Sequence, residues 1–145
     1  MNRTGSLRVA GYAALFDVAD GAKDVIRKGA FTRTLAEREG PLPLYWQHRP
    51  GQRIGTVERA EEDARGLRVI ARIERRSLAA ALLARRAVSG LSFGYRARGY
   101  RRTPAGRLLE DVELFEVSLV TRPLQHGARV HLILPELVSG RWQAP

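Results

Sequence analysis

The chain has 145 residues, which suits one compact domain, and its lack of cysteine excludes a disulfide framework, a thiolate zinc site and a cysteine nucleophile. Its 25 basic and 15 acidic residues give a net charge of +10, which favours an acidic partner such as nucleic acid, but the arginines are spread along the whole chain without a binding motif. No apolar stretch approaches the roughly 20 residues of a membrane helix and no secretory signal is evident, so we expect a cytosolic protein without membrane contact.

The first third of the chain predicts three strands and one helix. Residues 7–16 mix apolar and small residues around a glycine, which indicates a kinked strand, and residues 24–26 predict a short second strand. Apolar residues at nearly helical spacing predict a helix over residues 29–38. Residues 42–48 are rich in β-formers and predict a strand that ends at a turn over residues 50–51, where proline precedes glycine.

The middle of the chain predicts a β-hairpin followed by a helix. Residues 54–61 and 66–73 form the predicted hairpin, and the second arm alternates apolar and mostly basic residues. Residues 77–87 are rich in alanine and leucine, and Ser77 is a suitable N-cap, so they predict a helix. Arginines 85 and 86 are expected at its negative end.

The last third predicts strands over residues 91–101, 108–119 and 130–134, with a turn at residues 104–106. Seven or so strands with two helices indicate a mostly β (α+β) fold with a closed or nearly closed β-barrel, because closure removes exposed strand edges. We expect one domain over residues 1–138 and a flexible tail over residues 139–145.

His48 is a candidate general base. It lies near the end of a predicted strand, and an imidazole near its neutral-pH transition can take and return a proton. The alternative is a packed or surface histidine with no chemical role.

Ser92 is a candidate nucleophile within Gly90-Leu91-Ser92-Phe93-Gly94. A hydroxyl among apolar residues is unusual for packing, and the flanking glycines are expected to let a substrate backbone approach. A serine needs a neighbouring base to attack a carbonyl. A structural strand serine is the alternative, since Gly-x-Ser-x-Gly occurs widely and this one lies at a helix-to-strand junction, unlike a nucleophile elbow.

Glu116 is a candidate orienting carboxylate, because it lies in an apolar strand and a buried carboxylate needs a partner. A histidine that it orients and stabilises when protonated would be such a partner. The alternative is that strand alternation exposes it. By parity Glu113 falls on the opposite face, whereas Ser118 shares the face of Glu116 and could hydrogen-bond beside it.

Five segments together resemble the prohead protease family of tailed phages, which belongs with the herpesvirus assemblins. They occur in family order and cover roughly residues 9–130. The segments are GYAALF (11–16), DVI with GAF (24–31), LYWQH (44–48), GLSFGY (90–95) and LFEVSLV (114–120).

The resemblance implies a β-barrel flanked by helices, with Ser92 as nucleophile, His48 as general base and Glu116 as third member. Backbone amides near Arg122 would form the oxyanion hole, although Pro123 has no amide to donate and the following residues depart from the family pattern. His126 and His131 are alternative third members, because the herpesvirus enzymes use a second histidine. No cofactor or metal is expected, and the three histidines show no helical ligand spacing.

The function implied is a serine endopeptidase that cleaves capsid or scaffold protein inside an assembling procapsid and also processes itself. The tail over residues 139–145 is a candidate self-cleavage region. A homodimer is a further expectation from the herpesvirus relatives, and a specific nucleic-acid ligand is not expected. The particle could be a phage, a prophage or a gene-transfer particle. The alternative function is a non-catalytic capsid-assembly or nucleic-acid-binding β-barrel, which would explain the charge.

Overall fold

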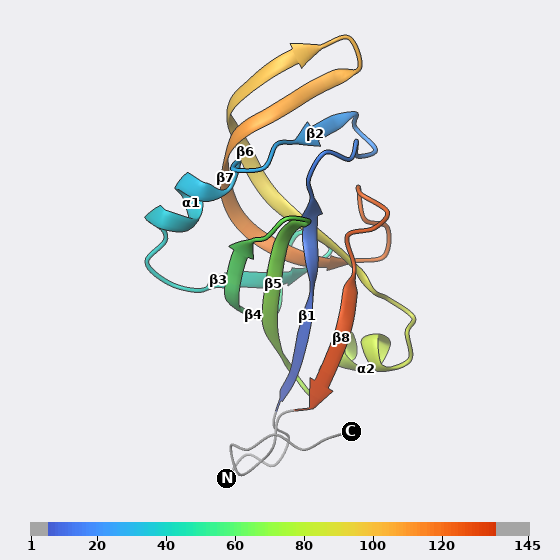
Figure 1. Ribbon diagram of the computed structural model, residues 1–145. Helices are drawn as coiled ribbons and strands as arrows, with labels where there is room; N and C mark the ends of the chain where they lie inside the picture. The colour runs from blue at the N-terminus through green and yellow to red at the C-terminus, as the bar shows by residue number, and fades with distance from the viewer. Residues whose placement is uncertain (1–5, 136–145) are drawn as a thin grey trace.

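Eight strands and two short helices build residues 6–135, the part of the chain that the computed structural model describes (Figure 1). The tail predicted over residues 139–145 lies outside this part. In chain order the elements are β1 (Ser6–Leu15), β2 (Asp24–Ile26), α1 (Thr32–Glu37), β3 (Leu42–Trp46), β4 (Arg49–Glu62), β5 (Gly66–Glu74), α2 (Leu78–Ala84), β6 (Gly90–Thr103), β7 (Gly106–Val120) and β8 (Val130–Pro135).

The strands form one mostly antiparallel sheet in which the long strand β7 pairs with three other strands. β6 pairs antiparallel with β7 along almost its whole length, while β2 and β3 pair in parallel with opposite ends of β7. The path continues from β3 through β4, β5 and β1 to β8. In Figure 1 the far ends of β6 and β7 extend together past β2.

The sheet does not close on itself within the described residues, so the closed barrel is not confirmed. The strand path ends at β2 and at β8, and β6 lies off this path, paired with β7. The start of β6 and the residue before β8 meet at an isolated bridge, between Gly90 and Arg129. Hydrogen bonds from Leu91 N to Ala128 O and from Val130 N to Ser89 O, both 2.8 Å long, flank that bridge. The mostly β class is confirmed.

The core lies on the face that the predicted alternation of β5 indicates. Leu67, Val69, Ala71 and Ile73 are all buried, whereas the side chain of Arg72 between them is exposed. Complete burial of a side chain as large as Ile73 stabilises the fold by about 1.5–3 kcal/mol. The predicted kink of β1 is also present, as register shifts beside Gly11 and Tyr12.

Both helices are shorter than predicted, because side-chain and turn contacts set their ends. α1 has six residues, and the carboxylate of Glu62 accepts hydrogen bonds from the backbone amides of Gly29 and Phe31 in the turn that precedes it. α2 has seven residues and is capped by Ser77, as predicted. Arg86 follows it with φ 57°, which ends the helix before the two arginines. Within residues 6–135, no helix is long and apolar enough to span a bilayer.

The turn that follows β3 lies earlier than predicted. Gln47 and His48 form a two-residue connection with φ values of 52° and 60°, and Trp46 pairs directly with Arg49. Pro50 and Gly51 therefore lie inside β4 rather than in the turn. Two consecutive residues with positive φ match the twist of a tight β-hairpin, which explains why the chain reverses here. His48 is a turn residue and not the last residue of a strand.

Candidate active site

The hairpin turn that carries His48 is held against the end of β7 by backbone hydrogen bonds. β3 pairs in parallel with β7, so Trp46 lies beside Leu119. The amide of Gln47 then donates to Leu119 O over 3.0 Å, and the amide of His48 donates to Ser118 Oγ over 3.1 Å. The parallel pairing thus brings residue 48 to a carboxylate nearly 70 positions later in the chain.

His48, Glu116 and Ser118 form one hydrogen-bonded group. His48 Nδ1 lies 2.5 Å from Glu116 Oε1, and Ser118 Oγ donates to Glu116 Oε2 over 2.6 Å. Glu116 is 7% exposed and Ser118 is fully buried, so the expected partner of the buried carboxylate is present. A carboxylate accepts, so Nδ1 carries the proton and Nε2 of the neutral ring is an acceptor. The side chain of His48 is 41% exposed.

Ser92 lies on the face of the sheet that carries this group. In the β6–β7 pairing Ser92 is directly opposite Ser118, and Gly94 is directly opposite Glu116. Side chains of directly opposed residues have Cβ atoms about 4.5–5.5 Å apart. Ser92 is buried and its hydroxyl makes no hydrogen bond within residues 6–135. The strand register therefore places Ser92 beside the Glu116 group, and within residues 6–135 its hydroxyl makes no hydrogen bond to His48.

The two glycines of the serine motif leave room for other parts of the protein. A Cβ at Gly94 would overlap Glu116 Oε1, and a Cβ at Gly90 would lie 2.6 Å from Val120 O and 2.7 Å from Pro123 Cδ. A register shift beside Gly94 leaves Phe115 as an extra residue on β7. Such bulges turn neighbouring side chains, and this one lies next to the carboxylate. The spacing of the motif was visible in the sequence, but the identity of these neighbours was not.

Gln47 ties the turn to the first residue after β7, a link that no sequence pattern indicated. Its Nε2 donates to Thr121 Oγ1, and its Oε1 accepts from the amide of Thr121, each over 3.1 Å. Arg122, the predicted oxyanion residue, follows directly and is exposed. The amide of Arg122 makes no hydrogen bond within the described residues.

The other candidate residues lie apart from the group around Glu116. His126 is exposed in the loop after β7, where its carbonyl oxygen accepts from Arg129 Nε. His131 belongs to β8 and packs beside Tyr12, with ring centroids 5.9 Å apart. Glu113 pairs with Arg96 over 2.6 Å. Within residues 6–135, no group of three or more histidine or acidic side chains could hold a metal ion.

A cluster of ion-pair and hydrogen-bond contacts links β2 to the long strands β6 and β7. The guanidinium of Arg107 donates two hydrogen bonds to the buried carboxylate of Asp24, 2.9 and 2.8 Å long, and the hydroxyl of Tyr95 donates a third. The bonds from Arg107 lower the pKa of Asp24 below its ordinary value. Burial, together with the nearby charge of Asp24, raises the pKa of Tyr95 to about 12.

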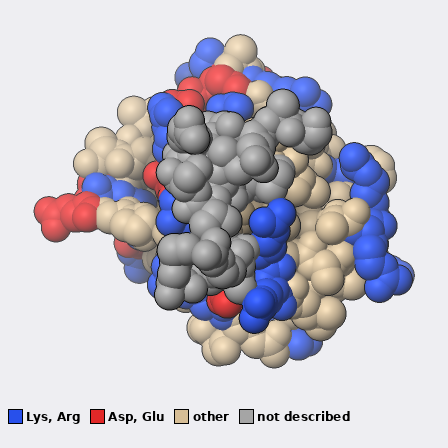
Figure 2. Space-filling model, turned by 90° about the horizontal axis from the view of Figure 1, so that it is seen from below, with Lys and Arg blue, Asp and Glu red and all other residues tan. Residues whose placement is uncertain are grey.

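On the face in Figure 2, the Lys and Arg side chains that are visible lie in several groups. Several arginines are paired with carboxylates, among them Arg8 with Glu58 and Arg27 with Glu110, each at 3.0 Å. Pairs of this kind at a surface stabilise little individually but neutralise part of the local charge.

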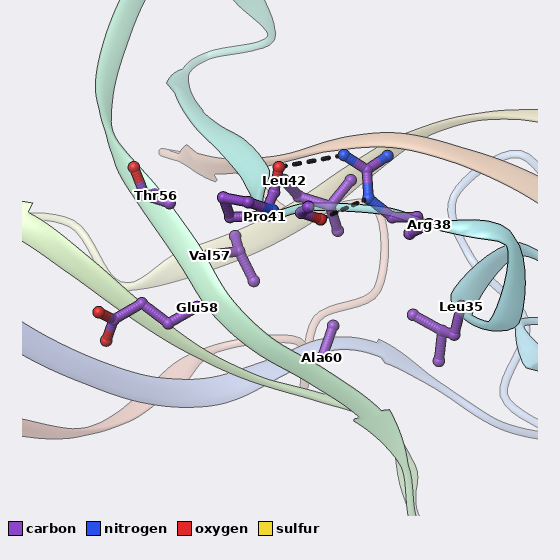
Figure 3. Close-up of a pocket in the computed structure, with 9 residues that line it drawn as sticks. Leu35, Arg38, Pro41, Leu42, Thr56, Val57, Glu58 and Ala60 are labelled. Carbon is purple, nitrogen blue, oxygen red and sulfur yellow. Dashed lines mark hydrogen bonds between the residues drawn. The ribbon is translucent and has the colours of Figure 1, made fainter.

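A separate pocket of about 570 Å³ lies between α1 and β4 (Figure 3). Leu35, Val57 and Ala60 are among its apolar lining residues. Arg38 donates at its rim to the carbonyl oxygens of Gly40 and Pro41. None of the predicted site residues lines this pocket, so we place the candidate site at the Glu116 group and not here.

The sequence matches the caudovirus prohead serine protease family over residues 2–139. It is 27% identical over 128 residues to the prohead protease of Enterobacteria phage HK97, across 83% of this chain and 57% of that protein. The chain thus spans less than two thirds of the length of this relative.

Two herpesvirus proteases are similar in structure. KSHV protease in complex with a hexapeptide phosphonate inhibitor gives a TM-score of 0.60 at 16% identity, covering 88% of this chain and 64% of that one. Varicella-zoster virus protease gives 0.56 at 18% identity, covering 87% and 63%. The TM-scores show a shared fold, and the match to the family model confirms the family resemblance predicted from the five segments. The chain belongs to the caudovirus prohead serine protease family.

Proposed function

We propose that this chain is a serine endopeptidase that cleaves capsid or scaffold protein during maturation of a phage or phage-like prohead. The observation that carries the proposal is the hydrogen bond between His48 Nδ1 and Glu116 Oε1, on the face of the sheet that also carries Ser92. A base oriented by a buried carboxylate and placed beside a serine is the arrangement that activates a hydroxyl for acyl transfer.

In the proposed reaction His48 Nε2 takes the proton of Ser92 Oγ as this oxygen forms a bond to the peptide carbonyl carbon. The imidazolium then gives the proton to the leaving amine as the C–N bond breaks, which leaves an acyl-enzyme. Water activated by His48 releases the acyl group and restores Ser92. Glu116 keeps the proton on Nδ1 and stabilises the imidazolium, while proton transfer by His48 contributes about 3–5 kcal/mol.

The Ser92–His48 hydrogen bond is expected to form when substrate binds. Catalytic hydrogen bonds are often long or unaligned without substrate and tighten in the complex. Excluding water over the exposed face of His48 would favour that contact. The buried Ser118 hydroxyl contacts both the backbone amide of His48 and the carboxylate of Glu116, and so links the turn to the carboxylate.

The amide of Arg122 is the proposed oxyanion donor, because it has no hydrogen-bond partner within residues 6–135 and follows the end of β7. A single donor of this kind lowers the barrier by about 3 kcal/mol. Pro123 supplies no amide, so a second donor must come from elsewhere in the site.

The proposed substrates are the major capsid protein and a scaffold segment, and the proposed place of action is the interior of the assembling procapsid. Self-processing in the tail over residues 139–145 and formation of a homodimer are also proposed, from the family resemblance. Family membership supports the capsid substrate, while the relatives' names support no choice between phage, prophage and gene-transfer particle.

The test is co-expression of the chain with its cognate major capsid protein, followed by intact-mass analysis. Wild type is expected to shorten the capsid protein, and Ser92→Ala to leave it at full length. Thr103→Val is the matched control, because it removes a hydroxyl from the distant end of the same strand and should process normally. Full-length capsid protein with all three chains would refute protease function and favour an assembly role.

A further inference from the structure

The side chain of Gln47 makes an unusual pair of contacts for a residue in a hairpin turn. Its amide group forms two hydrogen bonds to one residue, Thr121, while its backbone amide donates to Leu119 O. With the two hydrogen bonds of His48 to Ser118 and Glu116, the turn is fastened to β7 and the residue after it at five points. The two residues of the turn thus contact every part of the proposed site on β7.

The identity of residue 47 is not explained by the turn alone. Gln47 has φ 52°, a left-handed conformation that asparagine and glycine adopt more readily than glutamine. An asparagine would therefore suit the backbone better. Its side chain, however, is one methylene shorter, and both contacts to Thr121 already span 3.1 Å. Glutamine has the length that the contacts require, at some cost in backbone strain.

The contacts determine which amide of the following loop is available. Gln47 Oε1 accepts from the amide of Thr121, and Pro123 has no amide. Of these three residues, Arg122 alone has an amide without a partner in the described part of the chain. The Thr121 amide belongs to the Val120–Thr121 peptide, so these contacts hold the backbone directly before the peptide that carries the Arg122 amide. Because Gln47 precedes His48 in the same turn, the loop and the imidazole share one rigid support.

We propose that Gln47 is a positioning residue, which holds the Thr121–Arg122 peptide in register with His48 so that the Arg122 amide faces the reacting carbonyl. This inference rests on the proposed protease function. It assigns Gln47 no contact with substrate. Its effect is to keep base and oxyanion donor at a constant separation, and small displacements of such groups reduce the rate strongly.

The experiment compares wild type with Gln47→Asn. The asparagine side chain is too short for the two contacts to Thr121, but its backbone favours the turn. The melting temperature is expected to stay equal or rise. The value of kcat for capsid-protein cleavage is expected to fall by about 10- to 100-fold with little change in KM, since loss of an oxyanion donor costs about 10²–10³. Hydrogen exchange at the Thr121 amide, measured by NMR, should accelerate at least about tenfold relative to wild type.

Two variants of Thr121 complete the comparison. Thr121→Ser keeps the hydroxyl and the amide, so the amide at position 121 should exchange as slowly as in wild type. Thr121→Val keeps the shape and the amide but loses the Oγ1 contact, so kcat should fall between those of wild type and Gln47→Asn. Neither variant touches the proposed nucleophile or base.

The outcomes separate the two claims. An active wild type with unchanged kcat in Gln47→Asn overturns the positioning role and leaves the protease function standing. Fast Thr121 exchange in wild type overturns it as well, because the hydrogen bond to Gln47 would then be absent in solution. A wild type that cleaves nothing refutes the protease function, and with it the catalytic part of this inference. A KM effect without a kcat effect would assign Gln47 to substrate binding and contradict the proposal.

Discussion

Gly94→Ala tests whether catalysis requires the hydrogen bond between the buried carboxylate of Glu116 and His48. Gly94 does not have positive φ, so the backbone accepts alanine. The new methyl group, however, would overlap Glu116 Oε1 and lie 3.0 Å from its Cδ and Cγ atoms. The flexible end of a glutamate can move, and the movement that relieves the overlap takes Oε1 away from His48 Nδ1.

The size of the effect follows from the hydrogen bond that is lost. A hydrogen bond to a charged group contributes about 1.5–3 kcal/mol, and its loss in the transition state lowers kcat by roughly 10- to 150-fold. Stability should change less. Alanine in a strand gains about 0.5–1 kcal/mol over glycine, which offsets part of the cost of displacing the carboxylate. The variant is therefore expected to fold and to be slow.

The assay is the initial rate of capsid-protein cleavage by purified chain at saturating substrate, with unfolding by urea measured in parallel. Gly99→Ala is the matched control on the same strand, because its methyl group would meet only Asp111 Cβ at 3.6 Å, an ordinary contact. It should keep the wild-type rate. A folded Gly94→Ala variant with wild-type kcat would refute the role of Glu116, and an equal loss in Gly99→Ala would attribute the effect to β6 in general.

The remaining predictions concern the carboxylates. Glu116→Gln should fold but lower kcat by about 10³–10⁴-fold in the cleavage assay, because the amide cannot stabilise the imidazolium and permits the wrong tautomer; a loss below tenfold would contradict the assignment. The pKa of Asp24 is lowered by Arg107, so its contribution to stability is present above the unfolded pKa of about 3.9 and is lost as pH falls through the lower folded pKa. Urea unfolding at pH 7 and pH 3 should therefore show a smaller acid-induced loss in Asp24→Asn than in wild type, and an identical loss would show that this pair does not govern acid stability.

The sequence by itself determined the features that depend on neighbouring residues. Alternation in residues 66–73 predicted the buried face of β5, and Ser77 predicted the start of α2, because side-chain period and capping are local properties. The order of the five segments was sufficient to predict the family. The catalytic roles of Ser92, His48 and Glu116 came from that resemblance and are tested by the experiments above.

The tertiary structure decided everything that depends on residues far apart in the chain. Gln47 and His48 became the turn because their backbone and side-chain groups bond to β7, which outweighs the local preference for a turn at Pro50–Gly51. Gly94 leaves the space that the side chain of Glu116 occupies on the neighbouring strand, and the residues around Gly94 in the sequence do not reveal this contact. Closure of the sheet depends on pairing between β6 and β8, which the structure does not show in the described residues. The side chains of neither strand reveal which backbone edges will meet, so the sequence could not predict this.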